Sequence, residues 1–210
     1  MNSGPDKSAK SYLKGAAWPC ALLATLVGLA LLATPFGAGL QRWAFDLLFV
    51  TRQAKPLTEA VIVYMDEPSF VELGQIRDKP WSRALHGQFL RRMKEAGAKA
   101  VVFDIVFSDP GDSLEDGELA SAIKEMGAVY MGADLVETPA PNGLPLRTLS
   151  KPIPAFLAAG VQWGIVSLII DPDYAIRRQF PPDRENLTLA MAAAKGLTGQ
   201  LPVEQSYDHY

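Results

Sequence analysis

Hydrophobic residues in this chain form one long run followed by several short ones. Residues 15–41 contain no charged side chain, and Lys14 and Arg42 border them. Because a helix rises about 1.5 Å per residue, roughly 20 apolar residues cross the hydrocarbon core of a bilayer. The pattern predicts one transmembrane helix at 15–41. We expect it to be retained as a signal anchor, because the apolar core of a cleaved signal peptide is shorter.

The short runs that follow alternate with amphipathic stretches. β-Branched apolar runs at 60–66, 99–107 and 129–135 predict buried strands. Apolar residues at helical spacing predict helices at 83–96 and 113–126, each followed by a glycine. This β-α-β-α-β order, with continuous rather than alternating apolar strands, predicts a parallel sheet covered on both faces.

The C-terminal third has a different pattern. Four prolines between 139 and 152 and an Asn-Gly pair predict an exposed loop over 136–154, leading to a short helix near 153–159. Apolar runs at 162–170 and 174–180 flank turn residues and predict an antiparallel hairpin. A last amphipathic helix is expected to end at Gly196.

Together these elements predict an α/β fold. The folded part is a three-layer domain with a largely parallel sheet and a C-terminal antiparallel hairpin, preceded by one transmembrane helix. The predicted organisation is a polar cytoplasmic N-terminus (1–14), the membrane helix (15–41), an amphipathic connector (42–56), the folded domain (57–198) and a polar tail (199–210).

Composition narrows the classes of function. The net charge is −3, and acidic and basic residues are interspersed, so no basic stripe indicates a nucleic-acid partner. The single cysteine, Cys20, allows no intramolecular disulfide. The sequence has no glycine-rich phosphate loop, nucleophile elbow or paired histidines, so we expect neither an enzyme nor a bound cofactor.

Several segments, taken in order, resemble one known family. They are AVIVYMDEPSF from Ala60, PWSRALH from Pro80, GAKAVVFDIVFSDP from Gly97 and DPDYAIRRQF from Asp171. They are similar to the type-two CHASE (CHASE2) domain, the extracellular sensor of bacterial cyclases, histidine kinases and diguanylate cyclases. The segment QRWAFDLLFVTRQ, from Gln41, resembles the connector between the first membrane helix and that sensor.

The resemblance implies a place in the cell and a set of partners. It implies a single-pass protein of the bacterial inner (plasma) membrane, with a cytoplasmic N-terminus and an extracytoplasmic, periplasmic domain that binds a signal. The family continues with further membrane helices and a cytoplasmic output enzyme, so we expect the sensor domain to be incomplete within these residues. The expected partners are the membrane, a second copy in a homodimer, and a cytoplasmic output domain or protein.

Candidate ligand-binding residues come from the predicted topology. Ligands bind beyond the carboxyl ends of the strands in open parallel sheets, and acidic residues lie at or near three such ends. These carboxylates either hold a hard cation such as Ca²⁺ or cap neighbouring helices and loops. The candidates from these strand ends and the adjoining loop and helix are Asp66, Ser69, Trp81, Arg83, His86, Asp104, Ser108 and Asp134.

Two of these residues lead to specific expectations. Asp104 interrupts an apolar strand, so a buried carboxylate is expected there, with Arg83 as its first partner and His86 as its second. His86 is expected on the polar side of its helix, at the surface. Two alternative functions remain open. One is a metal-dependent hydrolase that uses Asp66, Asp104 and Asp134. The other is a self-association module with an apolar surface around Trp163 and Tyr174.

Overall fold

The computed structural model describes residues 7–50, 52, 58–139, 145–178 and 186–201. Parts of the predicted N-terminus, connector, 136–154 loop, second hairpin arm and polar tail therefore lie outside the described residues. The chain divides into two compact units, Met1–Tyr64 and Met65–Tyr210, which are described separately.

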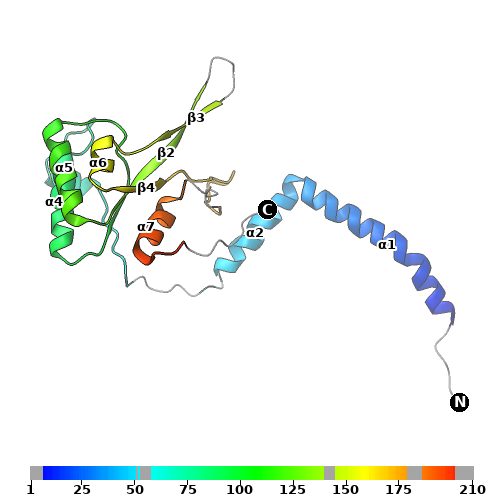
Figure 1. Cartoon of the computed structure of the whole chain (residues 1–210). Helices are drawn as coiled ribbons and strands as arrows, with labels where there is room; N and C mark the ends of the chain where they lie inside the picture. Colours follow the sequence, from blue (N-terminus) through cyan, green and yellow to red (C-terminus); the bar gives the residue numbers. More distant parts are fainter. Residues whose placement is uncertain (1–6, 51, 53–57, 140–144, 179–185, 202–210) are drawn as a thin grey trace. The chain divides into compact units, whose positions relative to one another are not determined.

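The first unit contains two helices, α1 (Lys7–Ala33) and α2 (Pro35–Val50) (Figure 1). The prediction of one continuous helix over 15–41 is wrong, because the helix breaks before Pro35. Proline has no N–H to donate, and its ring clashes with the carbonyl one turn earlier. A β-carbon at Gly37 would overlap the Leu31 carbonyl oxygen, so the bend also depends on glycine.

Neither helix alone meets the requirements of a membrane span. Within the described part of the chain, no single helix has both the length and the apolar character to cross a membrane. Ala17–Ala33 and Pro35–Val50 meet at 81°, and together they have the length and composition of a broken span or re-entrant loop.

The apolar run before Asp66 does not form the predicted strand. Residues 60–65 are exposed and irregular, with Val61 90% and Tyr64 72% accessible. β-Branched composition alone does not make a strand, which also needs a neighbour for its backbone groups. Asp66 instead caps helix α3 (Glu67–Glu72), where its carboxylate accepts a hydrogen bond from the Ser69 amide at 3.0 Å.

The second unit is built on a sheet with β2 at its centre (Figure 1). The first half of β2 (Val129–Pro139) lies parallel to both β1 (Val101–Val106) and β4 (Gln162–Ile165). The predicted parallel sheet is confirmed for these strands. β3 (Pro145–Ser150) pairs antiparallel with the second half of β2, within the stretch predicted to be a loop. The Asn-Gly pair belongs to the connection between these two strands, which lies outside the described residues, whereas Pro139 and Pro145 are themselves the paired ends of β2 and β3.

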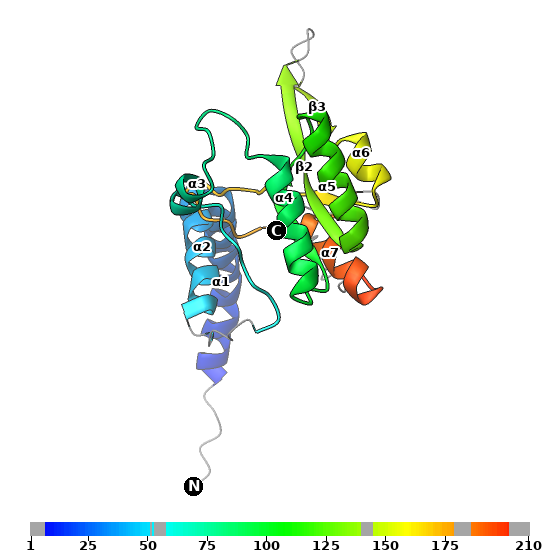
Figure 2. The ribbon, with the colours of Figure 1, turned by 90° about the vertical axis from the view of Figure 1, so that its left-hand side faces the viewer.

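Helices cover both faces of the central strand, β2. Val129 and Met131 of β2 pack in one core cluster with residues of α4 (Arg83–Glu95), α5 (Ser113–Met126) and α6 (Pro154–Ala158). Tyr130, which points the opposite way, packs against α7 (Leu189–Thr198). The three-layer arrangement is confirmed, and Figures 1 and 2 show α4 and α5 side by side.

The C-terminal elements are shorter than predicted. β4 ends at Ile165, and the described part of the hairpin is reduced to one antiparallel bridge between Ile169 and Arg178. Helix α7 ends at Gly199, which adopts a left-handed conformation with φ of 72°. Gly196 lies inside the helix, where a β-carbon would overlap the Tyr130 hydroxyl group. That glycine therefore permits close packing and does not end the helix.

Candidate functional site

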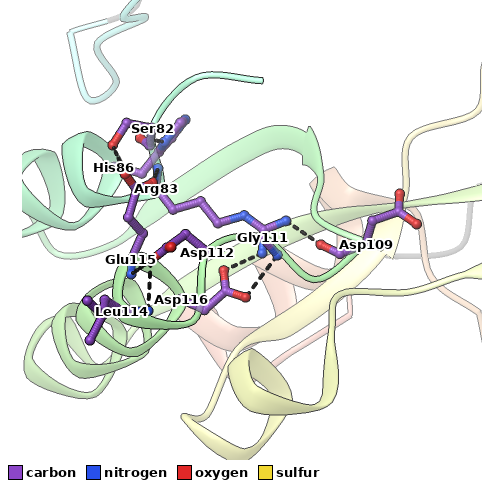
Figure 3. A network of polar contacts seen from close by, with 9 residues as sticks. All are labelled: Ser82, Arg83, His86, Asp109, Gly111, Asp112, Leu114, Glu115 and Asp116. Carbon is purple, nitrogen blue, oxygen red and sulfur yellow. Dashed lines mark hydrogen bonds and ion pairs between the residues drawn. The ribbon is translucent and has the colours of Figure 1, made fainter. Parts of the chain in front are cut away.

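Arg83 lies at the centre of a polar cluster between α4, α5 and the segment after β1. Its guanidinium group forms an ion pair with Asp116 on α5 and donates to the Asp109 carbonyl oxygen (Figure 3). The Arg83 and Asp116 side chains are only 13% and 11% exposed. We call Ser82, Arg83, Asp109, Gly111, Asp112, Glu115 and Asp116 the Arg83 network.

The surroundings of the Arg83 guanidinium hold it in place. It lies 5.5 Å from the ring centroids of both Phe107 and Phe156, within the range of a cation–π interaction. Asp116 also accepts a hydrogen bond from the Gly111 amide at 3.0 Å. A β-carbon at Gly111 would lie 3.1 Å from the guanidinium, so a larger residue would crowd it. Lysine could not reproduce this planar, multiply bonded contact.

The network also satisfies the N-termini of two helices. Glu115 on α5 accepts hydrogen bonds from the Ser82 hydroxyl at 2.9 Å and the Arg83 amide at 2.7 Å, and so caps α4 from outside. Asp112 caps α5 itself, accepting from the Leu114 amide at 2.9 Å. Free amides and the helix dipole make such ends electropositive, so these carboxylates stabilise both helix starts where they are joined.

His86 packs directly beneath this network, contrary to the expectation that it lies at the surface. Its residue is 7% exposed, and its ring meets the Phe103 and Phe107 rings edge to face, with centroids 5.8 and 5.3 Å away. Its Nδ1 donates to the Ser82 carbonyl oxygen at 2.9 Å. Burial, as the largest cause, lowers the pKa of His86 below its usual value, and the Arg83 charge adds to this.

The candidates on the segment before α4 contact each other or nearby aromatic residues. The Ser69 hydroxyl donates to Asp66 at 2.5 Å, and this bond is the main cause of the lowered pKa of the Asp66 carboxyl group. Trp81 packs edge-on against Phe70, with ring centroids 6.0 Å apart. Of the predicted candidates, the structure brings Arg83 and His86 into one cluster, whereas Asp66 and Ser69 form a separate helix cap.

The prediction of a buried Asp104 is wrong. Val101 and Phe103 face the core, and Asp104, on the other face of β1, is exposed. Arg83, its expected partner, pairs with Asp116 instead. Alternation along a strand that is covered on one side only explains the error, because the sequence pattern had indicated burial on both faces.

The remaining acidic candidates have separate partners as well. Asp134 accepts from the Ser167 hydroxyl at 2.7 Å, and Ser108 donates to Asp109 at 3.1 Å. The described residues contain no group of three His, Cys, Asp or Glu side chains that could hold a metal ion. The hypothesis that Asp66, Asp104 and Asp134 share a cation is therefore wrong, and the hydrolase alternative loses its proposed metal site.

A second polar cluster organises the hairpin after β4. The Asp171 carboxylate, 8% exposed, accepts hydrogen bonds from Arg177 at 3.0 Å and Arg178 at 2.8 Å. These bonds lower the pKa of the Asp171 carboxyl group, and a bond from Arg177 lowers that of Asp173 to about 2. At the turn, Tyr174 adopts a left-handed backbone conformation with φ of 63° and leaves its side chain exposed.

Sequence reasoning missed Asp116, Glu115 and Asp171. The spacing of Asp112 and Glu115 is that of a capping box, in which the glutamate would bond back to its own helix start. Here Glu115 bonds to the start of α4 instead. The capping signal was thus present in the sequence, but the recipient helix could be identified only from the packing of α4 on α5.

Comparison with known proteins gives one match. A family model described as "CHASE2 domain" matches residues 21–207, which is most of the chain. No curated protein and no solved structure matches the chain.

Proposed function

We propose that this chain, which belongs to the CHASE2 domain family of sensor domains, is an extracytoplasmic sensor held at a bacterial inner membrane by its N-terminal helices. In this proposal the second unit binds a signal and transmits it across the membrane to a cyclase or kinase output. The membership in a sensor family carries the proposal.

The Arg83 network supports a sensing role, because any equilibrium in which α4 and α5 separate would have to break its bonds. It joins α4 to α5 through an ion pair and helix caps, and these bonds must be exchanged together if the two helices separate. A ligand shifts such an equilibrium only by binding one state more tightly than the other. Trp81, Arg83 and His86, all candidates from the sequence, lie at this end of α4, where we place the response to the signal.

The location can be tested by cysteine labelling in intact cells. In a Cys20→Ser background, Leu114→Cys places a thiol on an exposed position of α5, 78% accessible in the native residue. A membrane-impermeant maleimide should label this variant in cells with a permeabilised outer membrane. The matched variant Ser3→Cys should react only after lysis. Labelling of both variants only after lysis, or the reverse order, would contradict the proposed topology.

Signal binding is tested by thermal denaturation of the full chain in detergent micelles with panels of metals and small anions. A compound that binds the folded state raises the melting temperature in proportion to the logarithm of its concentration above the dissociation constant. A dose-dependent rise that survives Glu137→Ala, at an exposed ion pair remote from the network in sequence, would identify a candidate signal. A compound whose effect is equal in an unrelated protein would be discarded.

A specific observation favours self-association as a second candidate function. The hairpin exposes four large apolar side chains, at 54–89% accessibility: Leu168, Ile170, Tyr174 and Ile176. Trp163, which was expected to belong to this apolar surface, is half-buried. The Lys151 ammonium group lies 4.4 Å from the centroid of its ring. In sedimentation experiments Tyr174→Ser should weaken a homodimer, whereas Leu114→Ser should not. Equal behaviour of the two variants would remove this surface from the dimer.

A further inference from the structure

We propose that protons are a signal for this domain, and that acid loosens the contact between α4 and α5 by charging His86. The inference rests on the proposed sensory function for what the loosening achieves. The loosening itself follows from where the imidazole lies. His86 is in the first turns of α4, and its hydrogen-bond partner, Ser82, is also bonded to α5 through Glu115.

The hydrogen bond to Ser82 determines which ring nitrogen carries the proton at neutral pH. A carbonyl oxygen only accepts, so Nδ1 must donate and the neutral ring keeps its lone pair on Nε2. Acid adds a proton at Nε2, and the ring becomes a cation without breaking the bond to Ser82. Acid therefore destabilises the closed contact through the buried charge and not through the loss of a hydrogen bond.

Most of the surroundings oppose that charge. Phe103 of β1 and Phe107 after it are uncharged rings that cannot neutralise the cation, and Arg83 on the same helix is already positive. The N-terminal end of α4 carries the positive pole of the helix dipole. Glu115 on α5 favours the cation, but its oxygens already accept from Ser82 and Arg83. Asp116 on α5 is engaged by Arg83 and Gly111, and the Asp112 carboxylate caps α5.

The size of the response has an upper limit. A histidine in an opened state titrates near its usual value of 6.5. If the closed state does not take up the proton, the equilibrium constant for opening rises about tenfold between pH 7.5 and 5.5. Stability contributed by the neutral ring is therefore complete above pH 6.5 and falls as the pH drops below it.

The experiment uses the full chain in detergent micelles and has two readouts. The only other histidine is His209, so a His209→Gln chain shows a single imidazole in an NMR titration from pH 8 to 5. Hydrogen exchange, corrected for its intrinsic pH dependence, then compares residues 82–90 at pH 7.5 and 5.5, with β2 as the internal reference. We expect His86 to titrate below 6.5 and the start of α4 to open more often at pH 5.5, by up to about tenfold. The His86→Gln variant should lose this acid response, whereas His209→Gln should keep it.

Two results would overturn the proposal. One is a His86 that titrates at or above 6.5, which is measured without altering the site. The other is an acid response that persists in His86→Gln. Neither readout uses the membrane or an output enzyme, so either failure would leave the sensory assignment standing. Conversely, failure of the cysteine-labelling test would leave the proton response of the domain untouched.

Discussion

Removing the Asp116 carboxylate tests whether the Arg83 network holds α4 on α5. Asp116→Ala deletes the partner of a guanidinium that is only 13% exposed and leaves the Gly111 amide without its acceptor. A hydrogen bond to a charged group contributes about 1.5–3 kcal/mol, and an unsatisfied buried donor costs about 1–3 kcal/mol. These figures overlap with the 3–5 kcal/mol typical of a buried ion pair broken on one side. We therefore expect the free energy of unfolding to fall by about 3–4 kcal/mol.

The assay is urea denaturation of the full chain in detergent micelles, followed by far-ultraviolet circular dichroism. Glu137→Ala is the matched control, because it removes an equally direct acid–arginine pair whose side chains, Glu137 and Arg147, are 52% and 67% exposed. Exposed pairs contribute at most about 1 kcal/mol. If Asp116→Ala costs no more than Glu137→Ala, with similar denaturant slopes, the network does not hold the two helices together.

Two further predictions concern the other face of the sheet and the hairpin. Gly196→Ala should lower the free energy of unfolding by about 1–3 kcal/mol, because the new methyl group meets the Tyr130 hydroxyl. Tyr130→Phe in the same chain should recover part of the loss, and no recovery in thermal denaturation would place the strain elsewhere. The ion pair between Asp173 and Arg177 lowers the carboxyl pKa from 3.8 to about 2, so its contribution is present above pH 4 and disappears as the pH falls toward 2. Asp173→Asn should remove this pH dependence, measured as the difference between the denaturation midpoints of the two proteins.

The parts of the fold that sequence reasoning predicted are those in which local chemistry agrees with packing. Asp112 caps α5, and Gly127, the glycine expected after this helix, ends it with a positive φ of 87°. The β1 and β2 runs form parallel strands, and both strands were predicted. In each case capping, glycine conformation and hydrophobic spacing indicate the same element, so one sequence was enough.

Errors arose where a residue's environment depends on segments far along the chain. Leu85, Phe89 and Met93 have the spacing of a core stripe along α4. Phe89 and Met93 do pack on the core, but the most buried residues of the helix are His86, Gly87 and Leu90, so the buried face is rotated towards them. The Arg83 network supplies polar partners for that rotated face, and they come from residues about 30 positions later. The run at 60–65 has the composition of a strand but no neighbouring strand to pair with. Composition alone could not predict the missing neighbour.

The backbone of Tyr174 has a cost that bears on engineering. A non-glycine residue in the left-handed region is less stable than glycine there by roughly 1 kcal/mol. Packing of the Tyr174 side chain offsets little of this cost, because the residue is 89% exposed. Tyr174→Gly should therefore raise the free energy of unfolding. If the exposed ring also forms the contact between two copies, the same substitution would weaken self-association. One residue would then set both the stability of the domain and its ability to dimerise, in opposite directions.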